Sequence, residues 1–390
     1  MKHLLILRCG ERSIHRSWIN RIRDRMDMAF VYYDHANFAD DRPTYEDYIE
    51  GTKLTGVHDF LKKYPDLIEQ YDYFWLAEDD LYLPYKSIIG IIDFIDQFQP
   101  VLCAPSLTAD SYITHPITLK NNKLFLHGTD FVECMIPIMH RSFLSKTLSQ
   151  FIEFPVWGIE RYWQYLLWEF KEIAFIFDQW PIVHTRPVQS GSLYKTAANM
   201  AINLPADDQR AYNLYGQKFG RFINTLFGVT NDFDSKMLTG HLLREKMKYG
   251  MEDIEHFHGE KATADIYMRT RYMNDLFTQF LSFPTVQKLL RMPYITASES
   301  NIIVRDWAFG SLSENKIWCN FMKFDPSGKV IGYNQNNEHS WKMVNNNFAF
   351  FSREGEMTNL YENVSYNEGC LEMTGYHKGD PNNIHFLKEI

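Results

Sequence analysis

The chain has 390 residues, of which 45% are hydrophobic, 16% aromatic and 23% charged, and its formal net charge is −9. This composition is typical of a folded protein, and the length predicts two or three domains. The acidic balance excludes a general nucleic-acid binder, which needs a basic surface to displace counterions from phosphate, and no apolar run is long enough to span a bilayer.

Strand-like and helix-like segments alternate over the first half of the chain. The strand-like runs are 3–8, 28–33, 73–77, 101–104, 131–139 and 173–177, and the clearest helical patterns are 53–64, 86–98 and 160–170. The opening segment 1–7 is too short for the apolar region of a signal peptide and is better explained as the first strand. The alternation predicts an α/β domain over residues 1–204, with a mostly parallel sheet flanked by helices.

The next part of the chain, residues 205–292, carries apolar residues at helical spacing in segments 207–227, 235–249 and 262–281. This pattern predicts a helical region. Its basic residues lie among aromatics and leucines, which is compatible with peripheral contact at an inner membrane. An amphipathic bundle with a solvated face is the favoured interpretation.

Residues 293–390 contain short apolar runs separated by turn pairs, which are Ser327-Gly328, Glu354-Gly355 and Glu368-Gly369. Such spacing predicts antiparallel hairpins in a small β module.

The most informative segment is the aromatic run 71–77, which leads directly into Glu78, Asp79 and Asp80. The carboxyl end of a buried strand is where open α/β sheets place ligands. Three adjacent carboxylates there call for a cation, and Mg²⁺ or Mn²⁺ is usually held by one or two carboxylates together with substrate phosphates. A solvated acidic turn is the alternative for the triplet taken alone.

Two further segments carry acids with possible roles. Asp34 directly follows the second strand-like run, a position suited to a ribose hydroxyl or a base edge. In segment 157–160, Trp157 offers a flat apolar face, a glycine permits close backbone approach, and Glu160 can accept a proton. A glutamate at a helix start is also stabilised by the helix dipole alone.

A histidine and an arginine follow the last strand-like run of the first domain. His184 comes after an apolar approach, and Arg186 is two residues further on. Histidine is the commonest metal ligand and arginine binds phosphate bidentately, although a purely structural histidine is an open alternative.

The order of these features resembles the nucleotide-sugar-dependent glycosyltransferases of the GT-A fold. In that family an Asp-x-Asp-like motif at a strand end holds the metal and diphosphate, a Trp-Gly-x-Glu-like segment lies beside the acceptor, and a later histidine often completes the metal shell. The counterparts here are 78–80, 157–160 and His184. Over residues 1–195 the chain is also similar to a family of largely uncharacterised proteins with a GT-A-like domain, in segments 51–53, 71–81, 131–137, 157–160 and 183–185.

The resemblance implies a metal-dependent transfer of a sugar from a UDP-linked donor to a hydroxyl of a glycan or lipid-linked glycan, with inversion, in surface polysaccharide biosynthesis. The implied Mn²⁺ or Mg²⁺ ligands are Glu78, Asp80 and His184. From position and charge we further expect donor contacts from Asp34, Lys53, Asp79 and Arg186, with Glu160 as the base and acceptor contacts from Trp157 and Glu133.

Two departures from the family pattern leave roles open. The first acid of the metal motif is Glu78 rather than Asp, so its contact with the ion is direct or through water. Arg161 stands where a further acid commonly follows the Glu, which leaves Glu160 as the best candidate for the base. Glu133 lies within the apolar run 131–139, where a buried acid must be paired, with Arg141 for example, or must serve a ligand.

Two other functions use the same features. A non-catalytic carbohydrate-binding protein would recognise glycans through the C-terminal β module, and a metal-dependent hydrolase or nucleotidyltransferase would use the same acids. The five cysteines are odd in number and scattered, without zinc-like spacing, which predicts reduced core thiols in a cytosol. We therefore expect a cytoplasmic protein, with peripheral contact at the inner membrane as an option.

Overall fold

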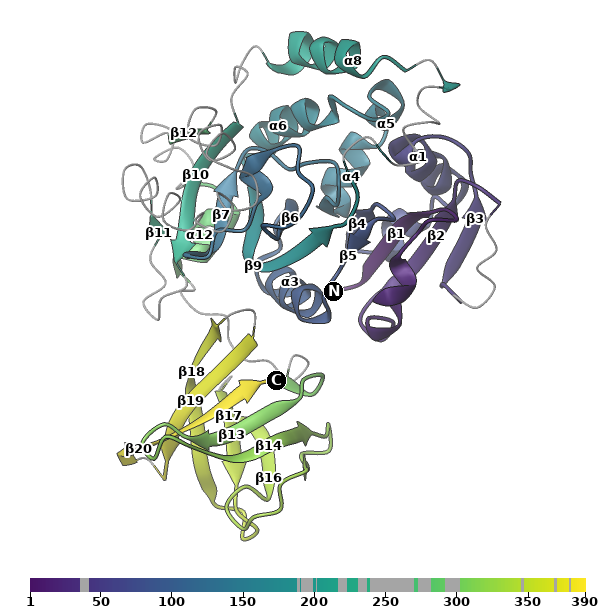
Figure 1. Ribbon diagram of the computed structural model, residues 1–390. Helices are drawn as coiled ribbons and strands as arrows, with labels where there is room; N and C mark the ends of the chain where they lie inside the picture. The colour runs from purple at the N-terminus through teal and green to yellow at the C-terminus, as the bar shows by residue number, and fades with distance from the viewer. Residues whose placement is uncertain are drawn as a thin grey trace. The chain divides into compact units, whose positions relative to one another are not determined.

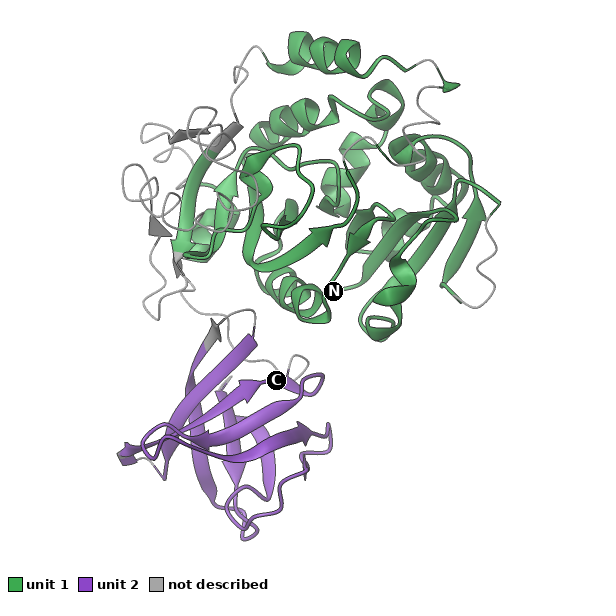
Figure 2. Cartoon of the chain, viewed as in Figure 1, with its two compact units in different colours: residues 1–230, 236–291 green, residues 231–235, 292–390 purple. Residues whose placement is uncertain are grey.

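The computed structural model describes residues 1–35, 42–187, 190, 199–200, 202–216, 223–230, 237–238, 270–272, 282–291, 302–344, 347–367, 370–378 and 380–390. The chain divides into two compact units, which Figure 2 colours separately: Met1–Thr230 with Lys236–Arg291, and Asn231–Ser235 with Met292–Ile390. Within the described ranges, no helix combines the length and apolarity that a membrane crossing needs.

The first unit is built on one large sheet (Figure 1). Its strands are β1 (His3–Cys9), β2 (Asp27–Tyr32), β3 (Tyr45–Tyr48), β4 (Tyr73–Ala77), β5 (Leu81–Tyr82), β6 (Leu102–Leu107), β7 (Leu124–Thr129), β8 (Ile138–His140), β9 (Ala174–His184), β10 (Ile223–Thr230), β11 (Met237–Leu238) and β12 (Thr270–Tyr272). The main path runs β11-β10-β7-β9-β6-β8-β4-β1-β2-β3, with β12 beside β10 and β5 beside β9.

The sheet is parallel from β3 through β2 and β1 to β4, and again between β6 and β9. Strand β8 lies between these parallel groups and is antiparallel to both neighbours. The predicted α/β class is thus confirmed, with antiparallel strands inserted in the sheet. Because β1, β2 and β4 run the same way, their carboxyl ends meet at one edge.

Helices cover both faces of this sheet. They are α1 (Lys53–Lys63), α2 (Leu67–Gln70), α3 (Tyr85–Phe98), α4 (Arg141–Thr147), α5 (Gln150–Glu153), α6 (Ile159–Phe170), α8 (Leu204–Ala211) and α12 (Pro284–Arg291), with shorter turns η1 (His15–Ser17), η2 (Ile19–Arg21), η3 (Pro116–Thr118) and η4 (Tyr212–Gly216). The predicted helices 53–64, 86–98 and 160–170 correspond to α1, α3 and α6.

Alternate residues of the strands face two different cores. Leu4 and Ile6 of β1 pack with the apolar faces of α1, α4 and α6. On the opposite face, Trp75 Nε1 lies 3.1 Å from His3 Nδ1, and His3 Nε2 lies 3.2 Å from Asp96 of α3. Successive side chains of a strand point to opposite faces, and His3 contacts α3 while Leu4 contacts the other helices. Helix α3 therefore lies on the other side of the sheet, as Figure 1 shows.

An aromatic cluster fixes α3 against β9. The Phe94 ring centroid lies 4.9 Å from that of Phe177 and 6.5 Å from that of Trp180. Gly90 makes this approach possible, because a Cβ at that position would lie 2.2 Å from the Trp180 indole. The long strand that ends in His184 is thereby anchored at its centre.

The predicted helix over residues 207–227 is wrong in its second half. Helix α8 ends at Ala211 and η4 at Gly216, whereas Ile223–Thr230 forms β10, antiparallel to β7, instead of continuing a helix to residue 227. The consecutive residues Leu226 and Phe227 are both buried, which a strand covered on both faces permits. Segments 235–249 and 262–281 lie mostly outside the described residues, and the described parts, β11 and β12, are strands.

The run 131–139 is not one strand. Only Ile138–His140 is extended as β8, and residues 131–137 form a loop between β7 and β8. Pro137 has no N–H to donate to a ladder, which explains why the strand begins after it. Glu133 therefore lies in a loop and not within a sheet.

The second unit is an eight-stranded antiparallel sheet, which confirms the predicted β module. Its strands are β13 (Trp307–Ser311), β14 (Lys316–Phe324), β15 (Val330–Ile331), β16 (Ser340–Val344), β17 (Asn347–Phe351), β18 (Met357–Asn367), β19 (Cys370–His377) and β20 (Asp380–Glu389), in the order β15-β14-β13-β20-β19-β18-β17-β16. Gly328 and Gly355 occupy turns with positive φ of 87° and 85°. The predicted turn at 368–369 has its glycine outside the described residues. All five cysteines are free thiols.

Truncation of the aromatic cluster should destabilise the first unit. We expect Phe94→Ala to lower the free energy of unfolding by about 3–5 kcal/mol, because it removes a fully buried ring and leaves a cavity. The control Ile152→Ala, at a side chain 54% exposed on α5, should change it by no more than about 0.5 kcal/mol. Urea unfolding followed by circular dichroism measures both, and equal effects of the two substitutions would contradict the assigned packing.

Candidate functional site

Backbone pairing brings the acidic triplet to the end of β9. Glu78, Asp79 and Asp80 occupy the turn between β4 and β5, and Leu81 of β5 is paired with His184. The Asp80 carbonyl oxygen accepts hydrogen bonds from Thr185 N–H at 3.0 Å and from its hydroxyl at 2.7 Å. Main-chain contacts thus hold the acids beside the imidazole.

Three side chains converge as a possible metal centre. Glu78, Asp80 and His184 each offer one ligand atom, and these atoms lie within 4.8 Å of one another. His184 Nδ1 lies 2.7 Å from the backbone carbonyl of Tyr112, so this nitrogen carries a proton and Nε2 is the ring atom that faces the acids. That Nε2 lies 3.4 Å from Asp80 Oδ2.

The donor set fits a divalent cation. Asp80 Oδ1 is buried and has no hydrogen-bond partner within the described ranges. Two carboxylates and one imidazole suit Mn²⁺, and Mg²⁺ is served by the same oxygens. Glu78, Asp80 and His184 are therefore the residues that would hold such an ion.

Two fixed cations lie beside the acids. Arg186 Nη2 is 2.9 Å from Asp79 Oδ1, and its Nε is 3.6 Å from Asp80 Oδ2. Lys53 Nζ lies 3.5 Å from Glu78 Oε1. With His184 neutral, as a metal ligand must be, three carboxylates face two side-chain cations, and one negative charge is left for a metal ion to compensate.

Asp79 is the most constrained of the three acids. Tyr33 donates a hydrogen bond of 2.5 Å to Asp79 Oδ2, while Arg186 contacts the other oxygen. The Tyr33 ring packs directly against Gly10. A side chain at position 10 would not fit, because its Cβ would lie 2.2 Å from the ring. Because both of its oxygens are engaged, Asp79 holds Arg186 in place, and its predicted contact with a donor stays a prediction.

The three carboxyls differ in their tendency to ionise. Burial raises the pKa of Asp80, but the hydrogen bond and charge of His184, with Arg186, outweigh it and leave the pKa lowered. For Asp79 burial is the stronger effect and its pKa is raised, and burial also raises the pKa of Glu78. Asp80 is thus the acid most firmly held as a carboxylate, as a metal ligand must be.

A second pair of acids lies next to this cluster. Glu160 Oε1 accepts a hydrogen bond of 3.2 Å from Cys134 N–H, and the carbonyl of Cys134 accepts one from Lys53 Nζ. Burial raises the pKa of Glu160 to about 7, and it raises that of Glu133 to about 8 with help from the charge of Glu160.

One carboxylate oxygen of Glu133 is unsatisfied. Its Oε2 is buried and lacks a hydrogen-bond partner among the described residues. The alternative partner Arg141 lies instead against Glu69, at 4.0 Å, so that pairing is wrong. The charges of Glu78 and His184 also act on the pKa of Glu133, so Glu133 lies near the metal ligands as well as near Glu160.

Two predicted residues lie at the margin of the cluster. Trp157 is half-buried just before Gly158, whose φ of 96° opens α6. Asp34 follows Tyr33 at the end of β2, and its Oδ2 accepts a hydrogen bond of 2.9 Å from Glu11 N–H. Both lie on segments that border the site, and no described contact joins either to the metal ligands.

Sequence inspection missed several supporting residues. Tyr33 holds Asp79, the carbonyl of Tyr112 orients His184, and Ser111 Oγ accepts a hydrogen bond of 3.1 Å from His184 N–H. The tyrosine next to Asp34 was the available signal, because polar residues at neighbouring strand ends meet at one sheet edge.

Comparison with known proteins gives only distant likenesses. No protein-family model matches the chain, and no curated protein matches it. Among solved structures it is similar to S. aureus TarS residues 1–349, free and in complex with UDP-GlcNAc, at 10% and 11% identity and a TM-score of 0.36, over 91% of this chain and 98% of each TarS chain. A197 from STIV aligns at 9% identity and a TM-score of 0.29, over 48% of this chain and 95% of A197. Likenesses this remote do not define an activity.

Loss of one carboxylate should weaken ion binding at this site. We expect Asp80→Asn to lower Mn²⁺ affinity by more than about 10-fold. Loss of a residue that merely supports a metal ligand already costs about that much, and Asp80 is proposed to contact the ion itself. Asp110→Asn, a matched change at an exposed loop acid, should leave it unaltered. Isothermal titration with Mn²⁺ measures both, and equal affinities for Asp80→Asn and the unaltered protein would exclude Asp80 as a ligand.

Proposed function

We propose that the first unit is a metal-dependent glycosyltransferase that uses a nucleoside-diphosphate sugar, UDP-linked, as donor and a glycan hydroxyl as acceptor. The observation that carries this proposal is the convergence of Glu78, Asp80 and His184 at the carboxyl edge of parallel strands. Such an edge is the usual ligand site of open α/β sheets.

The cations beside the acids suit a diphosphate. Arg186 Nη1 is buried and has no hydrogen-bond partner in the described part of the chain, and Lys53 lies on the other side of the triplet. Both side chains can bind phosphate oxygens, and arginine does so bidentately. When bound, Mn²⁺ or Mg²⁺ supplies Lewis-acid stabilisation of the charge that develops on the leaving diphosphate.

The second acidic pair suits the acceptor. In the proposed step, Glu160 takes the proton of the acceptor hydroxyl while that oxygen attacks the anomeric carbon. The bond from the anomeric carbon to the diphosphate oxygen breaks on the opposite face, which inverts the configuration. Glu133 would accept a hydrogen bond from another acceptor hydroxyl, and Trp157 would offer its face to a sugar ring.

The remaining predicted roles follow from position. Asp34 would contact the ribose of the donor from the end of β2, and Asp79 would act by holding Arg186 toward the diphosphate. A glycan or lipid-linked glycan acceptor and a role in surface polysaccharide synthesis belong to the same proposal.

A donor screen tests the reaction class. UDP-sugars and GDP-sugars are incubated with the protein and Mn²⁺, with and without glycan acceptors, and the released product is identified. Release of a nucleoside diphosphate supports the transferase, whereas phosphate or pyrophosphate indicates a hydrolase or nucleotidyltransferase. Absence of turnover, together with no thermal stabilisation by UDP or GDP with metal, favours a carbohydrate-binding protein.

Removal of the proposed base should slow the chemical step. We expect Glu160→Gln to lower kcat by about 10² to 10⁴, the usual contribution of general-base catalysis. Glu169→Gln, on the exposed face of the same helix, is the matched control and should keep full activity. A kcat for Glu160→Gln within a few-fold of the control would remove Glu160 from this role.

The rate should also depend on pH in a direction set by Glu160. A general base acts when ionised, and burial raises the pKa of Glu160 to about 7, so kcat should rise as the pH increases through about 7 and level off above it. The Glu160→Gln protein should lack this rise. A rise that persists unchanged in the Glu160→Gln protein would show that another group is titrating.

A further inference from the structure

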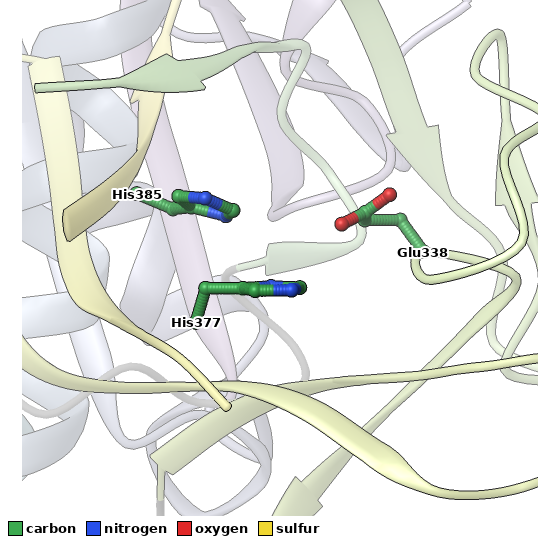
Figure 3. Close-up of side chains that lie close together, drawn as sticks. All are labelled: Glu338, His377 and His385. Carbon is green, nitrogen blue, oxygen red and sulfur yellow. The ribbon is translucent and has the colours of Figure 1, made fainter. Parts of the chain in front are cut away.

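A second group of metal-ligating side chains lies in the β module, apart from the site described above. It consists of Glu338, His377 and His385, which Figure 3 shows together. Glu338 comes from the segment between β15 and β16, and the two histidines come from β19 and β20. Gly375 is paired with His385, the register shifts after Tyr376, and the stacking of the two rings shows that His377 and His385 lie on the same face.

The three side chains are close enough to share one ion. Each offers a ligand atom, and these atoms lie within 4.8 Å of one another. The imidazole rings are stacked, with centroids 4.8 Å apart and an interplanar angle of 24°. The carboxylate of Glu338 points toward both rings in Figure 3. The arrangement combines two nitrogens and one carboxylate.

Glu338 is an acid without a compensating cation. It is 5% exposed, and no lysine or arginine pairs with it among the described residues. Buried carboxylates in proteins are normally paired with a cation or bound to a metal. A metal ion would supply the missing positive charge at this position.

One asparagine holds both histidines by the same ring atom. Asn359 of β18 is directly opposite His377 in the sheet, and its Oδ1 lies 3.0 Å from His377 Nδ1. Its Nδ2 lies 2.8 Å from His385 Nδ1. His377 Nδ1–H thus donates to the Asn359 oxygen, which is the usual orientation of a ligating histidine, whereas His385 Nδ1 accepts from the Asn359 amide.

The Nε2 atoms of His377 and His385 differ in their hydrogen bonding. Within the described residues no hydrogen bond reaches Nε2 of His377, whereas His385 Nε2 lies 3.1 Å from Asn383 Oδ1. Binding at His385 Nε2 therefore transfers its proton from Nε2 to Nδ1 and breaks the contact with Asn383. The Asn359 amide must then turn its oxygen toward His385 as well.

We propose that Glu338, His377 and His385 bind one divalent transition-metal ion, for which Zn²⁺ is the natural probe. Two histidines and one glutamate form a known zinc donor set, with a fourth position left for water. The ion would tie the segment of Glu338 to the β19–β20 hairpin. This site is independent of the proposed transferase activity.

Zinc binding to the full-length protein tests the proposal. The titrations use an Asp80→Asn background, so that the acidic site of the first unit is weakened. We expect one Zn²⁺ to bind, and expect Glu338→Gln or His377→Gln to lower its affinity by more than about 10-fold. His339→Gln, at an exposed histidine beside Glu338, is the matched control and should bind as before.

Replacement of the asparagine gives a test in the opposite direction. In Asn359→Asp, both carboxylate oxygens can accept an Nδ1–H, so both rings are free to bind through Nε2, and we expect tighter Zn²⁺ binding. Circular dichroism checks that each variant is folded. The proposal is overturned by absence of Zn²⁺ binding in the Asp80→Asn protein, by unchanged affinity in both ligand variants, or by weaker binding in folded Asn359→Asp.

Discussion

The short antiparallel pairing of β5 with the end of β9 is the constraint from which the candidate site follows. Next to it, the Asp80 carbonyl is a double acceptor for Thr185, a residue 105 positions further along the chain. Main-chain bonds of this kind fix positions that flexible side chains alone would hold at a larger entropic cost. Without the pairing, the acids after β4 would face no imidazole, and a metal ion would have carboxylates as its only ligands.

The acids at this edge of the sheet are paired with nearby cations. Buried carboxylates next to Lys53 and Arg186 lose solvation, and their mutual attraction repays only part of that loss. Asp79 accepts the arrangement by engaging both oxygens, while Asp80 retains an unsatisfied one. Asp79 therefore positions Arg186, and Asp80 remains available to a ligand.

The sequence predicts the parts of the fold that depend on local pattern. Strand 73–77 and the helices of Lys53 and Glu160 were correct because their periodicity is strong. The β10 strand was missed because helical spacing and a two-sided buried strand look alike over a few residues. Among the site residues, the order of acids and His184 was readable along the chain, but the hydrogen bond from Tyr33 was not, because it depends on which side chains meet across neighbouring strands.

One residue links the two halves of the proposed reaction. The amide of Cys134 donates to Glu160, and its carbonyl accepts from Lys53. A shift of the lysine toward a bound phosphate would pull on the same backbone unit that supports the glutamate. In the proposed reaction, donor occupancy and the alignment of the base would therefore be mechanically coupled, and an order of substrate entry in which the nucleotide comes first would follow from this loop.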